Sequence, residues 1–203
     1  MFLSFLKTLG CSICEYLLFY KTLTSVLTLT TKQKAYLCSI KSSATMTIIG
    51  VYYNYLYFFD QETFHNHDTF NTGKTFTTYF TAYLVTDSYL GTIEYPEYFT
   101  FLAGKVHHRV YILLSLICLY MNTYNVYLVF MISELPTLIL STGSFDKNYR
   151  SDLWFGISFF ATRLLYHMGM VYHFWYISLV PIFGVASTLL HAFWFNGWVK
   201  KYL

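Results

Sequence analysis

The sequence predicts an all-α membrane protein, a polytopic transmembrane helical bundle of about seven spans. Of its 203 residues, 56% are hydrophobic and only 11% are charged, whereas about 25% of the residues in a soluble domain are charged. The mean hydropathy is +0.43. The apolar runs are mostly long enough for a helical span and lack the strict two-residue alternation of a barrel strand. Because only helices or a closed barrel satisfy the backbone in hydrocarbon, helices are the better prediction.

The charge and the cysteine content argue against two other classes of function. The formal net charge is only +3, and lysine and arginine are scattered between apolar runs instead of forming the basic stripe of a nucleic-acid-binding protein. Cys11 and Cys14 form a C-x-x-C pair, but no second pair and no βαβ pattern accompany it. We interpret the four cysteines as small buried residues on helices, and expect neither a metal nor a bound cofactor.

Apolar runs separated by polar links define the expected spans. The first, residues 9–30, is the least certain because Glu15 and Lys21 interrupt it, and residues 1–33 are treated as a separate N-terminal unit. Residues 34–203 form the main transmembrane domain. Its expected spans are residues 36–58, 75–92, 106–121, 126–142, 153–173 and 176–198. The fourth and fifth spans are short for a hydrocarbon core of about 30 Å, so one span plus a re-entrant segment, and six spans in all, is the alternative.

With seven spans, lysine and arginine gather at one end of the bundle. That end holds Lys32, Lys34, Lys105, Arg109, Lys147, Arg150, Lys200 and Lys201. The other end holds mainly Lys7 and Lys74, so the positive-inside rule places the C-terminus in the cytosol and the N-terminus in the lumen. Lys200 and Lys201 match a dilysine retrieval signal for the endoplasmic reticulum. A positive anchor beside the last span explains the two lysines equally well.

Five polar residues in apolar surroundings are the candidate site. The pair His107 and His108 begins the fourth expected span, and Asp87, Glu134 and Arg163 lie in neighbouring spans. Ionisable groups are expensive in a membrane, so each is a functional hypothesis by default. The alternative is a buried polar network that only fixes helix packing.

Other histidines are weaker candidates. His65-Asn66-His67-Asp68 has metal-like spacing, but no third and fourth ligand can be identified, so an exposed polar loop is the better interpretation. His167 and His173 are expected at the membrane interface. His191 is expected to pack between helices.

The ordered set of polar residues resembles a known family. The set comprises Asp87, His107-His108, Ser133-Glu134-Leu135-Pro136 and Ala161-Thr162-Arg163-Leu164. It resembles the TLC domain, the membrane domain shared by ceramide synthases and several non-synthase lipid-handling proteins, over roughly residues 34–201. Ceramide synthases carry a further histidine and two aspartates downstream of the pair, where this chain has only Glu134. The resemblance is therefore closer to the non-synthase members, and it implies a role in membrane lipid composition, lipid homeostasis or transport.

The enzymatic alternative is an acyltransferase, which moves an acyl group from the co-substrate acyl-CoA to an amine or a hydroxyl. A ceramide synthase-like N-acyltransferase of sphingolipid metabolism would use an amine. A histidine would take the proton of the nucleophile or accept the acyl group, and Asp87 or Glu134 would orient it. Arg163 would neutralise a carboxylate or, as a substrate-binding residue, hold a phosphate; a buried pairing role is its alternative. His107 and His108 point about 100° apart on a helix, so at most one is the base.

Three functions thus stay open: lipid homeostasis or transport, acyl transfer, and a purely structural role. The expected partners are membrane lipids and not nucleic acids, and a homodimer within the membrane is a further open alternative.

Overall fold

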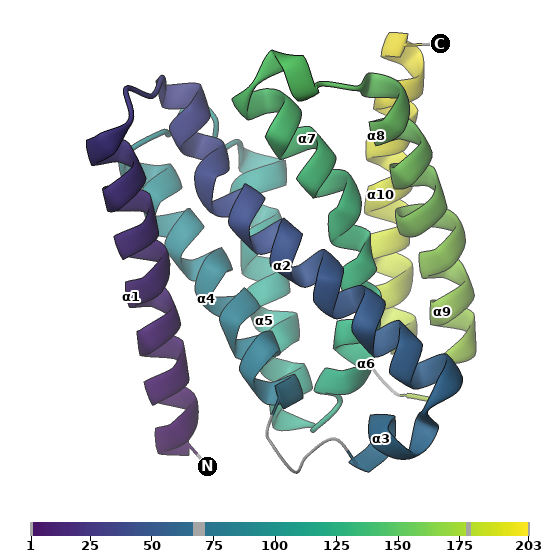
Figure 1. Cartoon of the computed structure of the whole chain (residues 1–203). Coiled ribbons are helices and arrows are strands. Elements are labelled where there is room, and N and C mark those ends of the chain that lie inside the picture. The colour runs from purple at the N-terminus through teal and green to yellow at the C-terminus, as the bar shows by residue number, and fades with distance from the viewer. Residues whose placement is uncertain (1, 67–71, 178–179, 203) are drawn as a thin grey trace.

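The computed structural model describes residues 2–66, 72–177 and 180–202, and these residues form helices and no strands. The all-α prediction is confirmed. Seven long helical segments alternate in direction (Figure 1). They are α1 (Phe2–Val26), α2 (Thr31–Phe59), α4 (Thr72–Ile93), η2 and α5 (Phe101–Val106, His107–Tyr120), α6, η3 and α7 (Tyr124–Val129, Phe130–Glu134, Leu135–Phe145), α8, η5 and α9 (Asp152–Phe159, Phe160–Tyr166, His167–His173), and α10 (Val180–Tyr202). Two short helices, α3 (Gln61–Asn66) and η4 (Lys147–Tyr149), lie in the connections.

Three of the described helical segments are long and apolar enough to cross a membrane. They are Phe101–Tyr120, Tyr124–Phe145 and Val180–Tyr202. This is the property expected of a membrane protein. The other long segments do not reach the same apolar level, so their crossing of the membrane belongs to the proposal made below.

The predicted lengths of the fourth and fifth spans were wrong. Residues 101–105 were expected to lie before the fourth span, but they belong to the π-helical segment η2, which continues directly into α5. The fourth segment therefore has 20 residues and the fifth has 22, and about 30 Å of helix is enough for a hydrocarbon core. By length and composition alone, each of the two segments is sufficient to cross a membrane. His107 and His108 consequently lie more than one turn inside the segment and not at its start.

The boundary between the first two helices also differs from the prediction. α1 ends at Val26, and Thr30 caps α2. The Thr30 hydroxyl accepts a hydrogen bond from the backbone N–H of Gln33, whose side chain accepts one from the backbone N–H of Thr30. This capping box satisfies two donors that the first turn would otherwise leave unpaired, which explains where the helix begins.

α2 is the central helix of the bundle. It packs against α4 on one side and against α6, η3 and α7 on the other. Gly50 allows the closest of these approaches, because a Cβ at this position would overlap the backbone of Met131 and Ile132 in η3. α1 covers α4 at one edge of the bundle, and α10 covers α8, η5 and α9 at the other (Figure 1).

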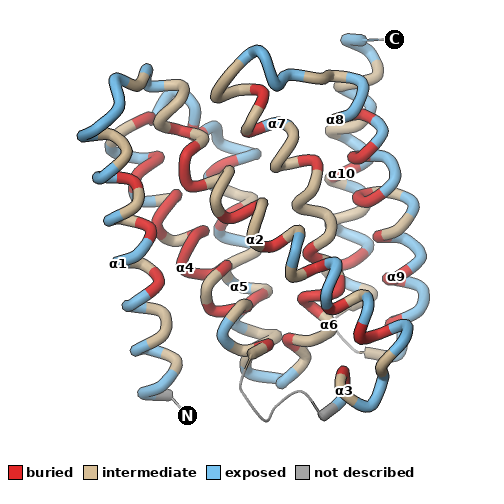
Figure 2. The backbone as a smooth tube through the Cα atoms, viewed as in Figure 1, coloured by how far each residue is buried: buried red, intermediate tan, exposed pale blue. Residues whose placement is uncertain are grey.

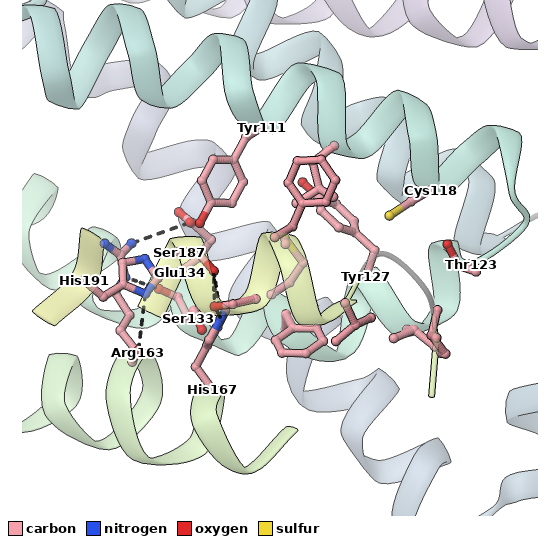
Figure 3. Close-up of a pocket in the computed structure, with 18 of the residues that line it drawn as sticks. Tyr111, Cys118, Thr123, Tyr127, Ser133, Glu134, Arg163, His167, Ser187 and His191 are labelled. Atoms are coloured by element: carbon pink, nitrogen blue, oxygen red, sulfur yellow. Dashed lines mark hydrogen bonds and ion pairs between the residues drawn. The ribbon is translucent and has the colours of Figure 1, made fainter. Parts of the chain in front are cut away.

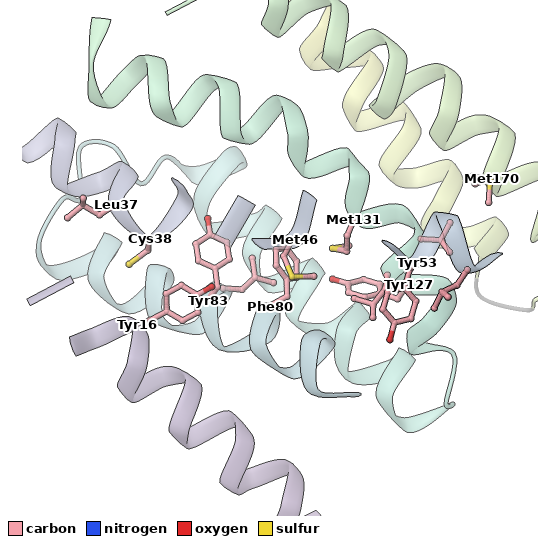
Figure 4. Close-up of a cluster of buried hydrophobic side chains, with 14 of the residues drawn as sticks. Tyr16, Leu37, Cys38, Met46, Tyr53, Phe80, Tyr83, Tyr127, Met131 and Met170 are labelled. Atoms are coloured by element: carbon pink, nitrogen blue, oxygen red, sulfur yellow. The ribbon is translucent and has the colours of Figure 1, made fainter. Parts of the chain in front are cut away.

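The core is unusually rich in tyrosine and methionine. Buried residues lie mostly along the parts of the helices that face the interior of the bundle, and exposed residues lie mostly on its outer faces (Figure 2). Tyr16, Met46, Phe80 and Tyr83 fill the space between α1, α2 and α4 (Figure 4). Many large apolar side chains remain on the outside, which suits contact with hydrocarbon.

The expectation that all cysteines are buried was wrong for two of them. Cys38 is buried and Cys118 is half-buried, but Cys11 and Cys14 are exposed on α1. Within the described residues, no group of three or more histidine, cysteine or carboxylate side chains is placed to hold a metal ion.

The two ends of the bundle differ in charge. The connections after α1, α4 and α7 lie at the same end as the C-terminus, and the N-terminus and α3 lie at the opposite end (Figure 1). This is the grouping of loops that the seven-span prediction requires. At the C-terminal end, the Arg150 guanidinium donates to the hydroxyl of Tyr202 at 2.9 Å and pairs with Asp152. The loop before α8 is therefore tied to the last turn of α10.

Candidate functional site

Each of the three segments that carry the central polar residues is irregular at the site. The π-helical segment η2 directly precedes His107. η3 tightens to a 3-10 helix at Glu134, because Pro136 has no N–H to donate to the carbonyl one turn before it. The π-helical segment η5 carries Arg163. π-helical turns occur frequently at functional sites, so their position is a signal independent of residue type.

Arg163 joins η5 to the irregular stretch around Glu134. Its Nε donates to the carbonyl oxygen of Ser133 at 2.8 Å, and a terminal nitrogen donates to the hydroxyl of Thr137 at 2.6 Å. The same nitrogen lies 3.7 Å from a carboxylate oxygen of Glu134. The Ser133 hydroxyl donates back to the carbonyl oxygen of Thr162 at 3.3 Å. Hydrogen bonds in both directions therefore join the stretch around Glu134 to η5.

His107 faces this group with a free ring nitrogen. Its Nδ1 is buried and has no hydrogen-bond partner among the described residues. The imidazole instead contacts two aromatic rings, with its centroid 4.4 Å from that of Tyr111 and 5.6 Å from that of Trp194. A buried imidazole nitrogen without a partner is costly unless a ligand or water satisfies it.

His108 belongs to a second polar group, on the side of α4. Its Nδ1 lies 3.7 Å from a carboxylate oxygen of Asp87 and 3.3 Å from the hydroxyl of Ser88. The hydroxyl of Tyr95 donates to the other Asp87 oxygen at 2.7 Å. Burial and the nearby Asp87 both raise the pKa of Tyr95, so its hydroxyl keeps its proton and remains a donor. The two histidines therefore face different partners, as their angular separation predicted.

Two cavities meet at the central residues. The first, here the apolar cavity, lies between α5, η3, α9 and α10, and its walls are mostly apolar side chains (Figure 3). The second, here the Asp87 cavity, has a volume of about 340 Å³ and reaches the loop between α4 and η2. His107, Glu134 and Arg163 line both cavities. They are the boundary between an almost wholly apolar space and one that also holds the polar side chains Asp87 and His108.

No protein-family model, curated protein or solved structure matches this chain. Its function is therefore argued from the site itself.

Two further histidines line the apolar cavity. His167 was expected at the membrane interface, but it is buried, and its Nε2 lies 2.9 Å from the hydroxyl of Ser187 (Figure 3). His191 was expected to pack between helices, and its Nδ1 lies 3.2 Å from the carbonyl oxygen of Arg163. The sequence held a usable signal for α10, because Gly184, Ser187 and His191 repeat at helical spacing on one face.

The loop with metal-like spacing lies largely outside the described residues. His65 is described and its side chain is exposed at the end of α3. His67 and Asp68 are outside the described residues.

Proposed function

We propose that the chain is a multi-pass membrane protein of the endoplasmic reticulum that binds a membrane lipid and acts in membrane lipid composition, lipid homeostasis or lipid transport. In this proposal all seven long helical segments cross the membrane, and the lysine-rich end faces the cytosol. The resemblance of its polar residues to the TLC domain is one source of the proposal. The site geometry is the other.

One observation carries the proposal: the apolar cavity and the Asp87 cavity meet at His107, Glu134 and Arg163. A lipid has an apolar chain and a polar group, so it needs an apolar space joined to a polar one. The apolar cavity suits the chain, and the buried residues at the junction offer both hydrogen-bond donors and acceptors to the polar group.

His107 is the residue that we expect to contact the lipid. Its unpartnered Nδ1 is available for a hydrogen bond. Arg163 is different, because Ser133 and Thr137 already accept hydrogen bonds from its Nε and from one of its two terminal nitrogens. We therefore propose that Arg163 chiefly holds Glu134 and the η3 backbone in place. His107 and Glu134 are the residues that bind the lipid.

The experiment is lipid analysis of cells that express the full chain. Wild type is expected to change the lipid profile, and His107→Ala and Glu134→Gln are expected to abolish that change. His65→Ala is the matched control, since His65 is an exposed histidine that lines neither cavity. A wild-type protein without effect on any lipid class, or a His107→Ala protein as effective as wild type, would favour a purely structural polar network.

An acyl-CoA-dependent N-acyltransferase is the second candidate, and the free Nδ1 of His107 favours it. In that reaction the substrate amine attacks the thioester carbonyl, the new C–N bond forms as the C–S bond breaks, and the amine proton passes to the imidazole. The thiolate of coenzyme A then takes a proton. Glu134 is placed to stabilise the charged imidazole from the opposite wall of the cavity.

Microsomes supplied with acyl-CoA and a sphingoid base test this candidate. Amide formation above background that is lost in His107→Ala and kept in His108→Ala would support it and identify the base. If wild type forms no amide above background, the acyltransferase hypothesis is refuted. The lipid-binding proposal is then tested by the lipid analysis alone.

A further inference from the structure

The apolar cavity is bounded by two helices that do not pack closely against each other. One face of α5 contributes Tyr111, Leu114 and Cys118, and one face of α10 contributes Phe183 and Ser187. Among the described residues, α5 packs on α4, α6 and η2, whereas α10 packs on α8, η5 and α9. Neither helix has the other as a close neighbour. A seam therefore runs between them along one wall of the cavity.

Side-chain exposure along this seam indicates that it is open. Leu114, Cys118, Phe183 and Ser187 line the cavity, yet each of them remains partly exposed. At the end of the seam nearest His107, the rings of His107 and Trp194 are in contact. The opening therefore lies on the other side of this contact, toward Leu114 and Phe183.

The two helices that border the seam determine what lies outside it. The segment Phe101–Tyr120 and α10 are two of the three described segments that are apolar and long enough to cross a membrane. Their outer faces carry large exposed apolar residues, among them Leu113, Leu116, Leu189 and Phe193. Surfaces of this kind face hydrocarbon, so the seam opens toward acyl chains and not toward water.

We propose that the apolar cavity opens sideways to the bilayer between α5 and α10, and that one acyl chain of a membrane lipid enters it through this opening. The inference rests on the proposed lipid-binding function and adds the route and the class of ligand. The chain then lies beside Tyr127 and Phe130 on the far wall, and the lipid's polar group lies at the end of the cavity that Glu134 and Arg163 line.

Photo-crosslinking in vesicles tests the route. The full chain is reconstituted in phosphatidylcholine vesicles that contain a phosphatidylcholine with a diazirine in the middle of one acyl chain. After irradiation, labelled residues are mapped by mass spectrometry. Tyr127 is only 5% exposed and lies on the far wall, so its label reports a chain inside the cavity. We expect Tyr127 and Phe130 to be labelled in wild type.

A pair of neighbouring substitutions separates the seam from the outer surface. Leu114→Trp fills the seam, and we expect labelling of the far wall to be lost. Leu113→Trp is the matched control, because Leu113 is 54% exposed on the outer face of the same helix, and labelling is expected to be kept. Leu114→Ala widens the seam and should increase labelling, which distinguishes blocked access from a misfolded variant.

Two results would overturn the route: a far wall that stays unlabelled in wild type, or equal labelling in Leu114→Trp and Leu113→Trp. Failure of the route is distinguishable from failure of the proposed function. If His107→Ala still alters the effect of the protein on cellular lipids, but the far wall is not labelled, only the lateral opening is refuted. If labelling occurs as expected, but the protein has no effect on cellular lipids, the opening is supported and the proposed role in lipid homeostasis is refuted.

Discussion

The Nε of Arg163 donates a hydrogen bond to the carbonyl oxygen of Ser133 at 2.8 Å, and the neighbouring residue along the chain is Glu134. The carboxylate of Glu134 lies 3.7 Å from the same guanidinium, and the two side chains are only 10% and 13% exposed. One arginine therefore supports both a distorted backbone and a buried acid. Since both segments line the apolar cavity, the contact also fixes the shape of the site.

We expect Arg163→Ala to lower the free energy of unfolding by about 3–5 kcal/mol, because it leaves a buried carboxylate and a buried carbonyl without partners. Arg163→Lys should cost less, since it keeps the charge but loses the planar fork that reaches Ser133 and Thr137 together. Denaturant unfolding in detergent, followed by tryptophan fluorescence, measures the loss.

Arg150→Ala is the control for this prediction. Arg150 pairs with Asp152 at the surface, where the two side chains are 43% and 41% exposed, so its loss should cost about 1 kcal/mol or less. The double variant Arg163→Met, Glu134→Leu should recover part of the stability, because the unpaired acid is gone. Equal losses in Arg150→Ala and Arg163→Ala would contradict the assigned role.

Gly50→Ala tests the close approach of α2 to η3. The added Cβ would meet the backbone of Met131 and Ile132, which cannot rotate away as a side chain can, so we expect a loss of about 1–3 kcal/mol. Gly197→Ala is the matched control on an exposed helix position with open space around it. It should be neutral or stabilise by up to about 1 kcal/mol. The same unfolding assay ranks the two, and a harmless Gly50→Ala would show that the two segments are not in contact.

The sequence predicted the helices better than it predicted the cavities. Apolar runs located the helical segments, and Asp87, Glu134 and Arg163 were expected on helices next to the histidine pair. The helix at Phe101–Val106 was missed, because Gly104 and Lys105 in a mixed aromatic stretch are typical of a loop.

The cavities could not be predicted in the same way. His167 lines the site because it is buried. Its position near the end of a predicted span did not indicate this burial. The seam depends on how far α5 stands from α10, and this distance follows from the packing of each helix on different neighbours. No local sequence pattern encodes such a separation.

The orientation of the bundle gives a prediction for glycosylation mapping. An Asn-x-Thr acceptor inserted in the turn after Asn122 should be glycosylated, because that end is expected to face the lumen. The same acceptor inserted beside Lys147 should not be, since the lysine-rich end is expected in the cytosol. A mobility shift on gels that disappears with a glycosidase reads out both insertions. The reverse pattern would invert the orientation, and modification of both sites would contradict the alternating directions of the helices.

The last prediction concerns the hydrogen bond from Tyr95 to Asp87, which we expect to hold His108 in place. Tyr95→Phe should cost about 1–3 kcal/mol, because the buried Asp87 oxygen loses its donor. Asp87→Asn, alone and combined with Tyr95→Phe, completes a double-mutant cycle. The stability loss of the double variant should differ clearly from the sum of the losses in the two single variants. Tyr98→Phe is the control, since Tyr98 is 41% exposed, and it should be close to neutral.

The cost of Tyr95→Phe should also depend on pH in one direction. Burial and Asp87 raise the pKa of Tyr95 in the folded protein, while the unfolded tyrosine ionises at about pH 10. Below that pH the tyrosine is protonated in both states and the cost stays constant. Above it the unfolded state loses a proton that the folded state keeps, so the wild type loses stability and the difference from Tyr95→Phe shrinks. A cost that grows between pH 9 and pH 11 would show that Tyr95 is ionised in the folded protein.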